Sequence, residues 1–169
     1  MSTRVRILGI DPGLLHTGWG VIEKDGARLV HIANGTINIP AKGTLPERLT
    51  QIYEKLSTVV KEYQPDEAAV EETFVNVNPA STLKLGQARG VAILTPALLG
   101  VKVFEYSPNL VKKSVVGVGH AAKEQVEMMV GVLLAKPAVD SEHAADSLAI
   151  AVCHAHNRTA NLGVANLRS

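Results

Sequence analysis

The sequence predicts an α/β fold in which a five-stranded mixed sheet is flanked by helices. Three strand-like segments come first and are separated by turn residues; they span 5–10, 19–23 and 29–39. Helical spacing then alternates with strand-like stretches, giving helices at 45–63, 81–98, 126–134 and 144–156 and strands at 68–70 and 101–105. Three antiparallel strands followed by a βαβ unit make a mixed sheet, with the order βββαβαβαα.

Two of these predicted strands end on carboxylates. The apolar run 5–10 stops at Asp11, which begins an Asp-Pro-Gly turn. The short buried strand 68–70 leads directly into Glu71 and Glu72. Between them, the segment 45–63 has its apolar residues on one helical face, which is typical of a helix that packs on a sheet.

Length and composition favour one globular domain. The chain has 169 residues, of which 46% are hydrophobic and 20% charged, and we assign residues 1–156 to the domain and 157–169, where periodicity is weak, to a flexible tail. No apolar run reaches the roughly 18 residues of a membrane span, and no signal peptide is visible, so we expect a cytoplasmic protein. The single cysteine, Cys153, excludes an internal disulfide and a cysteine-based zinc site.

Charge is distributed unevenly along the chain. The net charge is +1, yet the stretch 80–136 carries seven Lys or Arg residues against three Glu. Such a stretch suits DNA phosphates, and Lys84, Arg89, Lys112 and Lys123 are the candidate contacts. On charge alone, an ordinary solvated surface explains these residues equally well.

Four residues far apart in the sequence are candidates for a metal site: Asp11, Glu71, His143 and Asp146. Adjacent strands bring the first two together, and His143 and Asp146 share one face of the last helix. Carboxylates at close quarters repel one another unless cations lie between them. Oxygen ligands favour Mg²⁺ or Mn²⁺, and two such ions suit phosphodiester hydrolysis. Taken singly, Asp11 is explained as a turn former and His143 as an ordinary histidine, but Asp146 lies within an apolar helix.

Several motifs in this sequence resemble those of RuvC resolvases, which belong to the ribonuclease H-like superfamily. They occur in the family's order: GIDPG at 9–13, TGWG at 17–20, VEETF at 70–74, LGQARG at 85–90, VKKSVVG at 111–117 and HAADSLA at 143–149. The resemblance implies a ribonuclease H-like homodimer that binds four-way DNA junctions and nicks two opposing strands symmetrically in recombination and repair. It further implies two Mg²⁺ ions per active site, with Mn²⁺ as a substitute, and cooperation with the RuvA and RuvB branch-migration proteins.

The resemblance also assigns roles to individual residues. Asp11, Glu71 and Asp146 match the family's catalytic acids, and His143 stands where many members have Asp and others His, which implies an altered metal preference. Strand alternation selects Glu71 over Glu72.

Further matches concern DNA binding and assembly. Phe74 matches an aromatic residue that stacks on bases at the junction centre, although a core position beneath its loop is the alternative. Lys112 and Lys123 match lysines that approach the scissile phosphate, and exposed, salt-bridged lysines are the alternative. Gly86 and Gly90 lie on the helix that contributes to the family's dimer interface, with packing inside the chain as the alternative.

Two rival functions remain from the sequence. An actin-like nucleotide-binding ATPase also opens with a strand that ends in an Asp-x-Gly turn, but it needs two lobes, and this length provides one. A catalytically inactive junction-binding module is the second, and the retained acids at Asp11, Glu71 and Asp146 argue against it.

Overall fold

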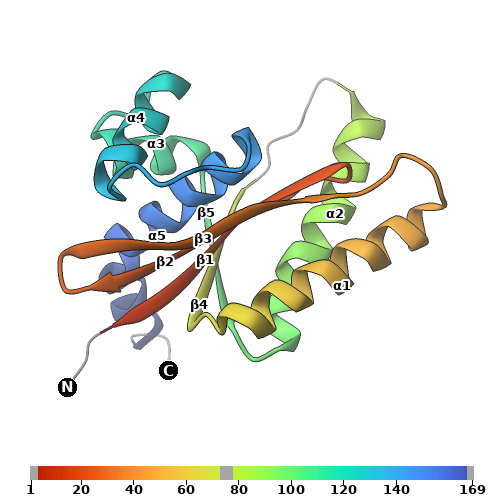
Figure 1. Cartoon of the computed structure of the whole chain (residues 1–169), viewed down its shortest axis with the longest axis horizontal. Helices are drawn as coiled ribbons and strands as arrows, with labels where there is room; N and C mark the ends of the chain where they lie inside the picture. Colours follow the sequence, from red (N-terminus) through yellow and green to blue (C-terminus); the bar gives the residue numbers. More distant parts are fainter. Residues whose placement is uncertain (1–3, 73–77, 167–169) are drawn as a thin grey trace.

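The computed structural model describes residues 4–72 and 78–166, with side chains described up to Arg158. Its strands form one five-stranded sheet in the order β3-β2-β1-β4-β5 (Figure 1). They are β1 (Val5–Asp11), β2 (His16–Asp25), β3 (Arg28–Asn38), β4 (Glu67–Glu71) and β5 (Lys102–Tyr106). The first three are antiparallel neighbours, whereas β4 is parallel to both β1 and β5. The predicted mixed sheet of five strands is confirmed.

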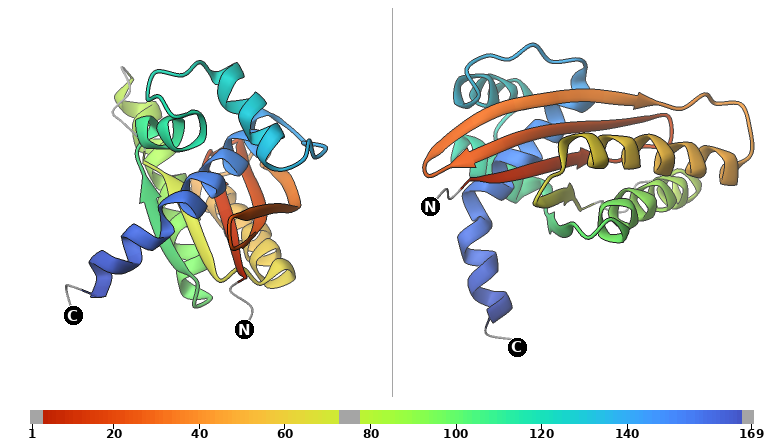
Figure 2. Two further views of the ribbon diagram at one scale, coloured as in Figure 1. Left: turned by 90° about the vertical axis from the view of Figure 1, so that its left-hand side faces the viewer. Right: turned by 60° about the horizontal axis from the view of Figure 1, so that its bottom comes forward.

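Helices cover both faces of the sheet (Figure 2). The helices are α1 (Leu45–Tyr63), α2 (Pro79–Leu98), α3 (Pro108–Val116), α4 (Lys123–Leu133) and α5 (Glu142–Asn166). Strand β1 shows why two layers are needed, because its neighbouring residues Ile7 and Leu8 are both fully buried and point to opposite faces. Ile7 belongs to the core shared with α3, α4 and α5, and Leu8 to the core shared with α1 and α2.

The first helix spans the predicted residues 45–63, and both of its ends are capped. Thr44 accepts a hydrogen bond from the backbone of Glu47, whose side chain accepts one from the backbone of Thr44, so the two residues form a capping box. At the other end, Gln64 adopts a left-handed conformation with φ of 46° and donates its N–H to the Val60 carbonyl. These caps fix the span of α1 across the sheet.

The predicted element order omits one helix. Helix α3 follows β5 directly, so the observed order is βββαβαβααα and the predicted order with two final helices is wrong. Ser107 caps α3, Pro108 occupies its first turn, and Gly117 ends it with φ of 98°. Only Val111 and Val115 are buried on this nine-residue helix, too few for a clear helical periodicity.

The last helix also extends beyond its predicted end at residue 156 and reaches Asn166, so the segment assigned to a tail begins inside α5. Side-chain contacts explain the continuation. Arg158 bonds to the Glu67 carboxylate in β4, and Asn157 donates to the Ser114 hydroxyl and the Cys153 carbonyl. Within the described part of the chain, no helix combines the length and the apolarity that crossing a membrane requires.

Candidate active site

Asp11 and Glu71 end two neighbouring parallel strands. Ile10 in β1 pairs with Val70 in β4, so the two acids follow at the same edge of the sheet. Glu71 is half-buried, whereas Glu72 is exposed. This difference favours Glu71 as the residue that acts at this edge, as strand alternation predicts.

Helix α5 lies directly on the first two strands because glycines remove the side chains that would block it. A Cβ atom at Gly9 would collide with the Ser147 carbonyl oxygen, and one at Gly18 would collide with the His143 carbonyl oxygen. The close approach places the first turns of α5 over the end of β1. His143 and Asp146 are thereby brought to the carboxylates of the sheet edge.

A hydrogen bond joins the helix to the strand at this point. The Nδ1 atom of His143 lies 3.2 Å from Oδ2 of Asp11. Burial raises the pKa of the Asp11 carboxyl, and the hydrogen bond from His143 partly offsets that rise. The side chain of His143 remains 41% exposed, so the imidazole is accessible from solvent.

The electrostatics of the other two acids show that the carboxylates lie close together. Burial, followed by the negative charges of Asp11 and Asp146, raises the pKa of Glu71 to about 7. Burial and the charge of Asp11 likewise raise the pKa of Asp146 to about 6. The arrangement is therefore unfavourable for three ionised carboxylates unless positive charge is added.

Two lysines supply part of that charge. Lys123 forms an ion pair with Glu142, and its Nζ lies 3.6 Å from Oδ2 of Asp146. The charge of Lys112 lowers the pKa of Glu71 against the opposing effects. Both lysines line a pocket of about 300 Å³ together with Glu71 and Asp146. Positive side chains thus stand beside the acids, on the side formed by α3 and α4.

The donor types of this site suit a hard divalent cation. Three carboxylates and one imidazole match the ligands that Mg²⁺ and Mn²⁺ accept, and a cation relieves the repulsion that raises the pKa values of Glu71 and Asp146. Among the described residues, no three His, Cys, Asp or Glu side chains are already arranged to hold one ion. The donor chemistry fits, and side-chain rotation is needed to close the ligands around a metal.

The other predicted site residues are placed differently. Phe74 falls in 73–77, outside the described residues. Lys84 is exposed on α2 and lines a separate groove that His143 also lines. Arg89 is engaged inside the protein, where it pairs with Glu105 and its Nε donates to the Glu71 carbonyl at 3.2 Å. The hydrogen bond to Glu71 holds Arg89 against the end of β4.

Sequence reasoning missed His16. Its ring stacks on that of His143 with centroids 5.3 Å apart, and its Nδ1 lies 2.8 Å from Oδ1 of Asn38. His16 follows the Asp-Pro-Gly turn by three residues, and only the path of that turn brings it to α5. The spacing to Asp11 is the one signal the sequence offers.

Comparison with known proteins identifies the family of this chain. The family model described as Crossover junction endodeoxyribonuclease RuvC matches residues 7–154. The chain belongs to the RuvC family. RuvC of Azorhizobium caulinodans is 58% identical over 154 residues, covering 91% of each chain. RuvC of Brucella suis is 55% identical over 158 residues, covering 94% of this chain and 91% of that protein.

Solved RuvC structures share the fold. Thermus thermophilus RuvC superposes with a TM-score of 0.83 at 34% identity, covering 92% of this chain and 96% of that chain. The same protein in complex with Holliday junction substrate gives 0.86 at 35% identity, with 94% and 96% covered. The predicted ribonuclease H-like fold is confirmed. As a RuvC-family protein, the chain is a nuclease whose chemistry depends on a divalent metal, and neither the actin-like ATPase nor the inactive module is favoured.

Proposed function

We propose that this RuvC-family chain resolves Holliday junctions. It binds four-way DNA junctions and nicks two opposing strands symmetrically, which serves homologous recombination and DNA repair. The observation that carries the proposal is the meeting of Asp11 and Glu71 with His143 and Asp146 at one edge of the sheet. The junction bound to the related Thermus thermophilus protein supports four-way DNA as the substrate.

In this proposal, Asp11, Glu71, His143 and Asp146 hold two Mg²⁺ ions, for which Mn²⁺ substitutes. Bound there, the ions supply an activated water and stabilise the departing 3′ oxygen. Asp11 and Glu71 come from rigid strand ends, and Asp146 is oriented by Lys123 at 3.6 Å. The sheet and α5 therefore fix the backbone positions of these ligands, and rotation of their side chains closes them around the ions.

Basic side chains oppose the charge of the DNA. Lys112 and Lys123 flank the acids, which is where a cation stabilises the additional negative charge of the reacting phosphate. Lys84 and Arg89 are proposed as further DNA contacts, and Arg89 must leave Glu105 to make one. Phe74 is proposed to stack on bases at the junction centre. Junction selectivity then comes mainly from DNA shape and phosphate positions.

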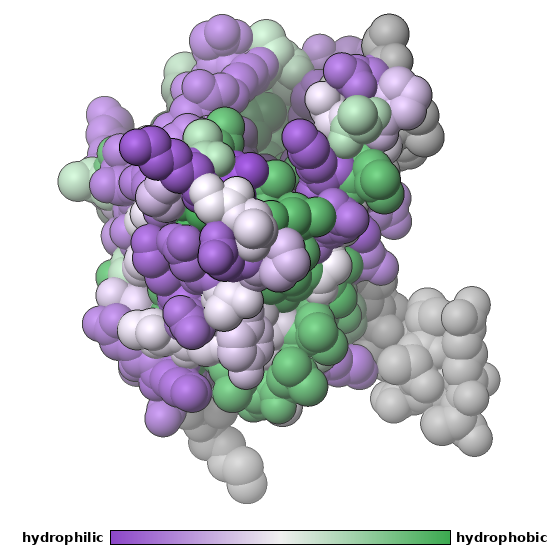
Figure 3. All heavy atoms as spheres, turned by 90° about the vertical axis from the view of Figure 1, so that its right-hand side faces the viewer, coloured by the Kyte–Doolittle hydropathy of each residue, from purple (hydrophilic) through white to green (hydrophobic). Residues whose placement is uncertain are grey.

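A homodimer completes the proposal, because two-fold symmetry presents one active site to each of two opposing strands. Helix α2 carries exposed leucines, with Leu83 at 64%, Leu94 at 53% and Leu98 at 61% exposure. A Cβ atom added at Gly86 or Gly90 meets no described atom within 4 Å, so packing inside the described chain does not explain these glycines. Figure 3, which faces the end of the molecule where α1 and α2 lie, shows hydrophobic residues gathered along one side. An apolar helix face with small residues suits a second copy.

The same proposal extends to the protein's setting. Cooperation with the RuvA and RuvB branch-migration proteins follows from the family resemblance, and a chromosomal substrate in a bacterial cell implies a cytoplasmic location.

The experiment is a cleavage assay on a synthetic four-way junction beside a linear duplex of the same sequence, with Mg²⁺ or Mn²⁺ added. We expect paired, symmetrical nicks in the junction and none in the duplex. Equal cleavage of both DNAs, or junction binding without nicking under either metal, would contradict the proposal.

A further inference from the structure

A second groove is separate from the pocket that Lys112 and Lys123 line, and His143 is part of its lining. It has a volume of about 450 Å³ and lies between the loop after β1 and the N-terminal parts of α1 and α2. Leu15 lines it from the loop, His16 from the start of β2, Arg48 from α1 and Lys84 from α2. His143 also lines it and contacts Asp11, so the groove borders the candidate active site.

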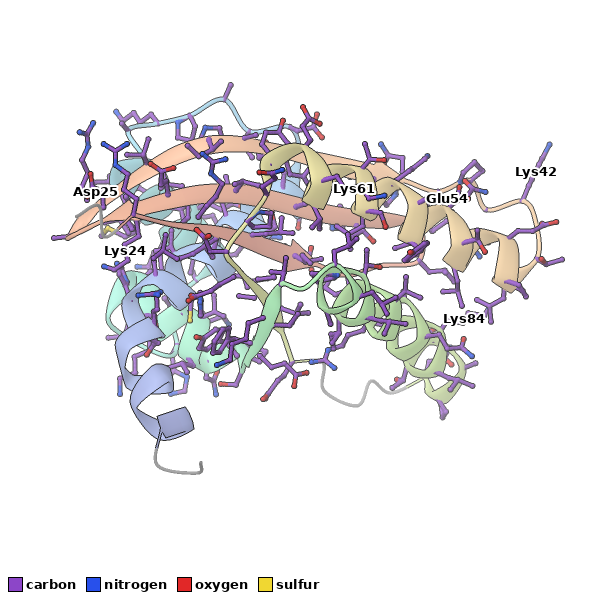
Figure 4. All side chains as sticks on the ribbon, turned by 90° about the horizontal axis from the view of Figure 1, so that it is seen from below. Lys24, Asp25, Lys42, Glu54, Lys61 and Lys84 are labelled. Carbon is purple, nitrogen blue, oxygen red and sulfur yellow. The ribbon has the colours of Figure 1, made fainter. Side chains whose placement is uncertain are left out.

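The ionisable side chains that line this groove are all basic or imidazole. They are Arg48, Lys84, His16 and His143, and among the described residues no Asp or Glu lines it. Lys84 is exposed and pairs with no described carboxylate. Figure 4 shows Lys84 on the side of α2 that faces the first turns of α1. The groove is therefore electropositive, in contrast to the acidic site beside it.

Arg48 has hydrogen-bonding capacity that the chain does not use. Its Nη2 donates to the Leu14 carbonyl at 3.3 Å, which holds the guanidinium at the groove. Its Nε is buried and has no hydrogen-bond partner among the described residues. A phosphate group accepts two hydrogen bonds from one guanidinium at once, and a small shift of the guanidinium within the groove presents the unpartnered donor to such a group.

Leucines complete the lining. Leu14, Leu15 and Leu85 lie among the basic residues, and Leu15 is 46% exposed. Charged and apolar groups together match a nucleotide unit, whose phosphate is anionic and whose sugar is largely apolar. A free inorganic anion uses only the charged groups, so the leucines favour a polymer strand.

We propose that this groove binds one backbone phosphate of the DNA strand that is being cut, with Arg48 and Lys84 as its cations. The inference rests on the proposed function, since it takes DNA as the substrate, and it adds a second fixed point on that strand. His16, which also lines the groove, is stacked on His143, the residue that contacts Asp11. A phosphate held in the groove sets which neighbouring phosphate reaches Asp11 and Glu71.

The test compares two matched charge removals on exposed lysines, Lys84→Gln in the groove and Lys61→Gln near the C-terminal end of α1 (Figure 4). Junction affinity is measured over a range of salt concentrations, without divalent metal. We expect Lys84→Gln to weaken binding about threefold to tenfold and to reduce the salt slope by about one, because one phosphate contact is lost. Lys61→Gln leaves both unchanged, and Lys84→Arg retains the slope.

A second measurement locates the phosphate. A series of junctions is prepared, and each carries one neutral methylphosphonate in place of a phosphate. The position of this substitution moves stepwise along the strand on either side of the cleaved bond. At one position, neutralisation weakens binding most in the wild-type protein and less in Lys84→Gln, where Arg48 remains. The effect is smallest in Arg48→Lys/Lys84→Gln, because lysine keeps the charge at position 48 but loses the two-pronged hydrogen bonding of arginine.

The outcomes separate the two proposals. If the wild-type protein neither binds nor cuts the junction, the proposed function fails. If it binds and cuts, but Lys84→Gln equals Lys61→Gln in affinity and salt slope and no methylphosphonate distinguishes it from the wild type, the groove proposal is overturned and the proposed function stands.

Discussion

The Nδ1 atom of His143 lies 3.2 Å from Oδ2 of Asp11, so a hydrogen bond joins α5 to the end of β1 at the centre of the candidate site. The ring of His16 stacks on the same imidazole. The ring is therefore fixed from two directions before any metal or DNA is added, and its orientation decides which nitrogen faces a ligand.

The first prediction concerns metal preference. His143→Asp replaces an imidazole by a carboxylate, and oxygen ligands favour Mg²⁺ whereas nitrogen is tolerated better by Mn²⁺. We expect the Mg²⁺ concentration for half-maximal junction cleavage to fall several-fold relative to that for Mn²⁺. Calorimetric titration of both ions gives a readout independent of cleavage. An unchanged ratio of the two metal affinities would show that His143 is not a ligand.

The second prediction concerns pH and stability without metal. The pKa of Glu71 is about 7 in the fold against an ordinary value of 4.5, so the folded protein holds a proton that the unfolded chain releases over this range. Stability from this group therefore falls as the pH rises. Glu71→Gln removes the effect and should unfold with a free energy about 1–2 kcal/mol higher than wild type at pH 8, with little difference at pH 5.

Thermal or urea unfolding in EDTA at the two pH values measures this difference. Added Mn²⁺ should reverse the order at pH 8, because only the wild-type carboxylate binds the ion strongly. Equal stability of the two proteins in EDTA at pH 8 would mean that burial and the neighbouring carboxylates do not destabilise the ionised form of Glu71.

The third prediction concerns the buried network that anchors α5 at its other end. A neutral His154 donates from Nε2 to Glu67 at 2.6 Å and accepts at Nδ1 from the Tyr106 hydroxyl at 2.6 Å, while Arg158 bonds to the same carboxylate. Glu67→Ala leaves these partners unsatisfied and should cost about 3 kcal/mol of unfolding free energy. Asp25→Ala, which breaks an exposed ion pair with Arg4, is the control and should cost less than about 1 kcal/mol.

This effect has a predictable pH dependence. Burial raises the pKa of Glu67, but the hydrogen bonds from Arg158 and His154 together lower it by more than burial raises it. The net shift of the pKa is therefore downward. The stabilisation from Glu67 is therefore present above its ordinary pKa and is lost as the pH falls through the lowered value. The gap between wild type and Glu67→Ala should narrow in acid, and a gap that widens there would contradict the assignment.

The fourth prediction contrasts two glycines. Gly9→Ala places a Cβ against the Ser147 carbonyl, so α5 must move and stability should fall by at least about 2 kcal/mol, with loss of cleavage. Gly86→Ala meets no described atom within 4 Å and raises helix propensity, so the fold should not be destabilised. Its effect should instead be a weaker dimer, seen by analytical ultracentrifugation. If Gly86→Ala forms a dimer as stable as that of the wild type, α2 is not part of the dimer interface.

Much of the fold is predictable because its elements carry strong local signals. Strand β1 is a nearly continuous apolar run, since Ile7 and Leu8 are buried on opposite faces, and α1 has both a capping box and an apolar stripe. Helix α3 lacks such a stripe, and its Ser107-Pro108 start signal is short. The extension of α5 depends on Arg158 meeting Glu67, a contact between residues 91 positions apart.

The candidate site divides in the same way. Asp11 and Glu71 are predictable as neighbours because parallel strands end at the same edge. Asp146 is predictable as a functional residue because an unpaired carboxylate in an apolar helix is energetically costly. His16 and Arg48 were not predicted as parts of the site's surroundings. Their contacts, of His16 with His143 and of Arg48 with the Leu14 carbonyl, depend on the path of the loop after β1, and no periodic pattern in the sequence predicts that path.

The most direct test of the account is single-turnover cleavage and equilibrium binding of a four-way junction by Asp146→Asn beside the wild-type protein, in Mg²⁺. Asparagine keeps the size of the side chain and removes the charge that a metal ligand needs. We expect cleavage to fall by at least about a thousandfold while junction affinity stays within about threefold of wild type. Cleavage at the wild-type rate by Asp146→Asn would contradict the metal-dependent mechanism at this site.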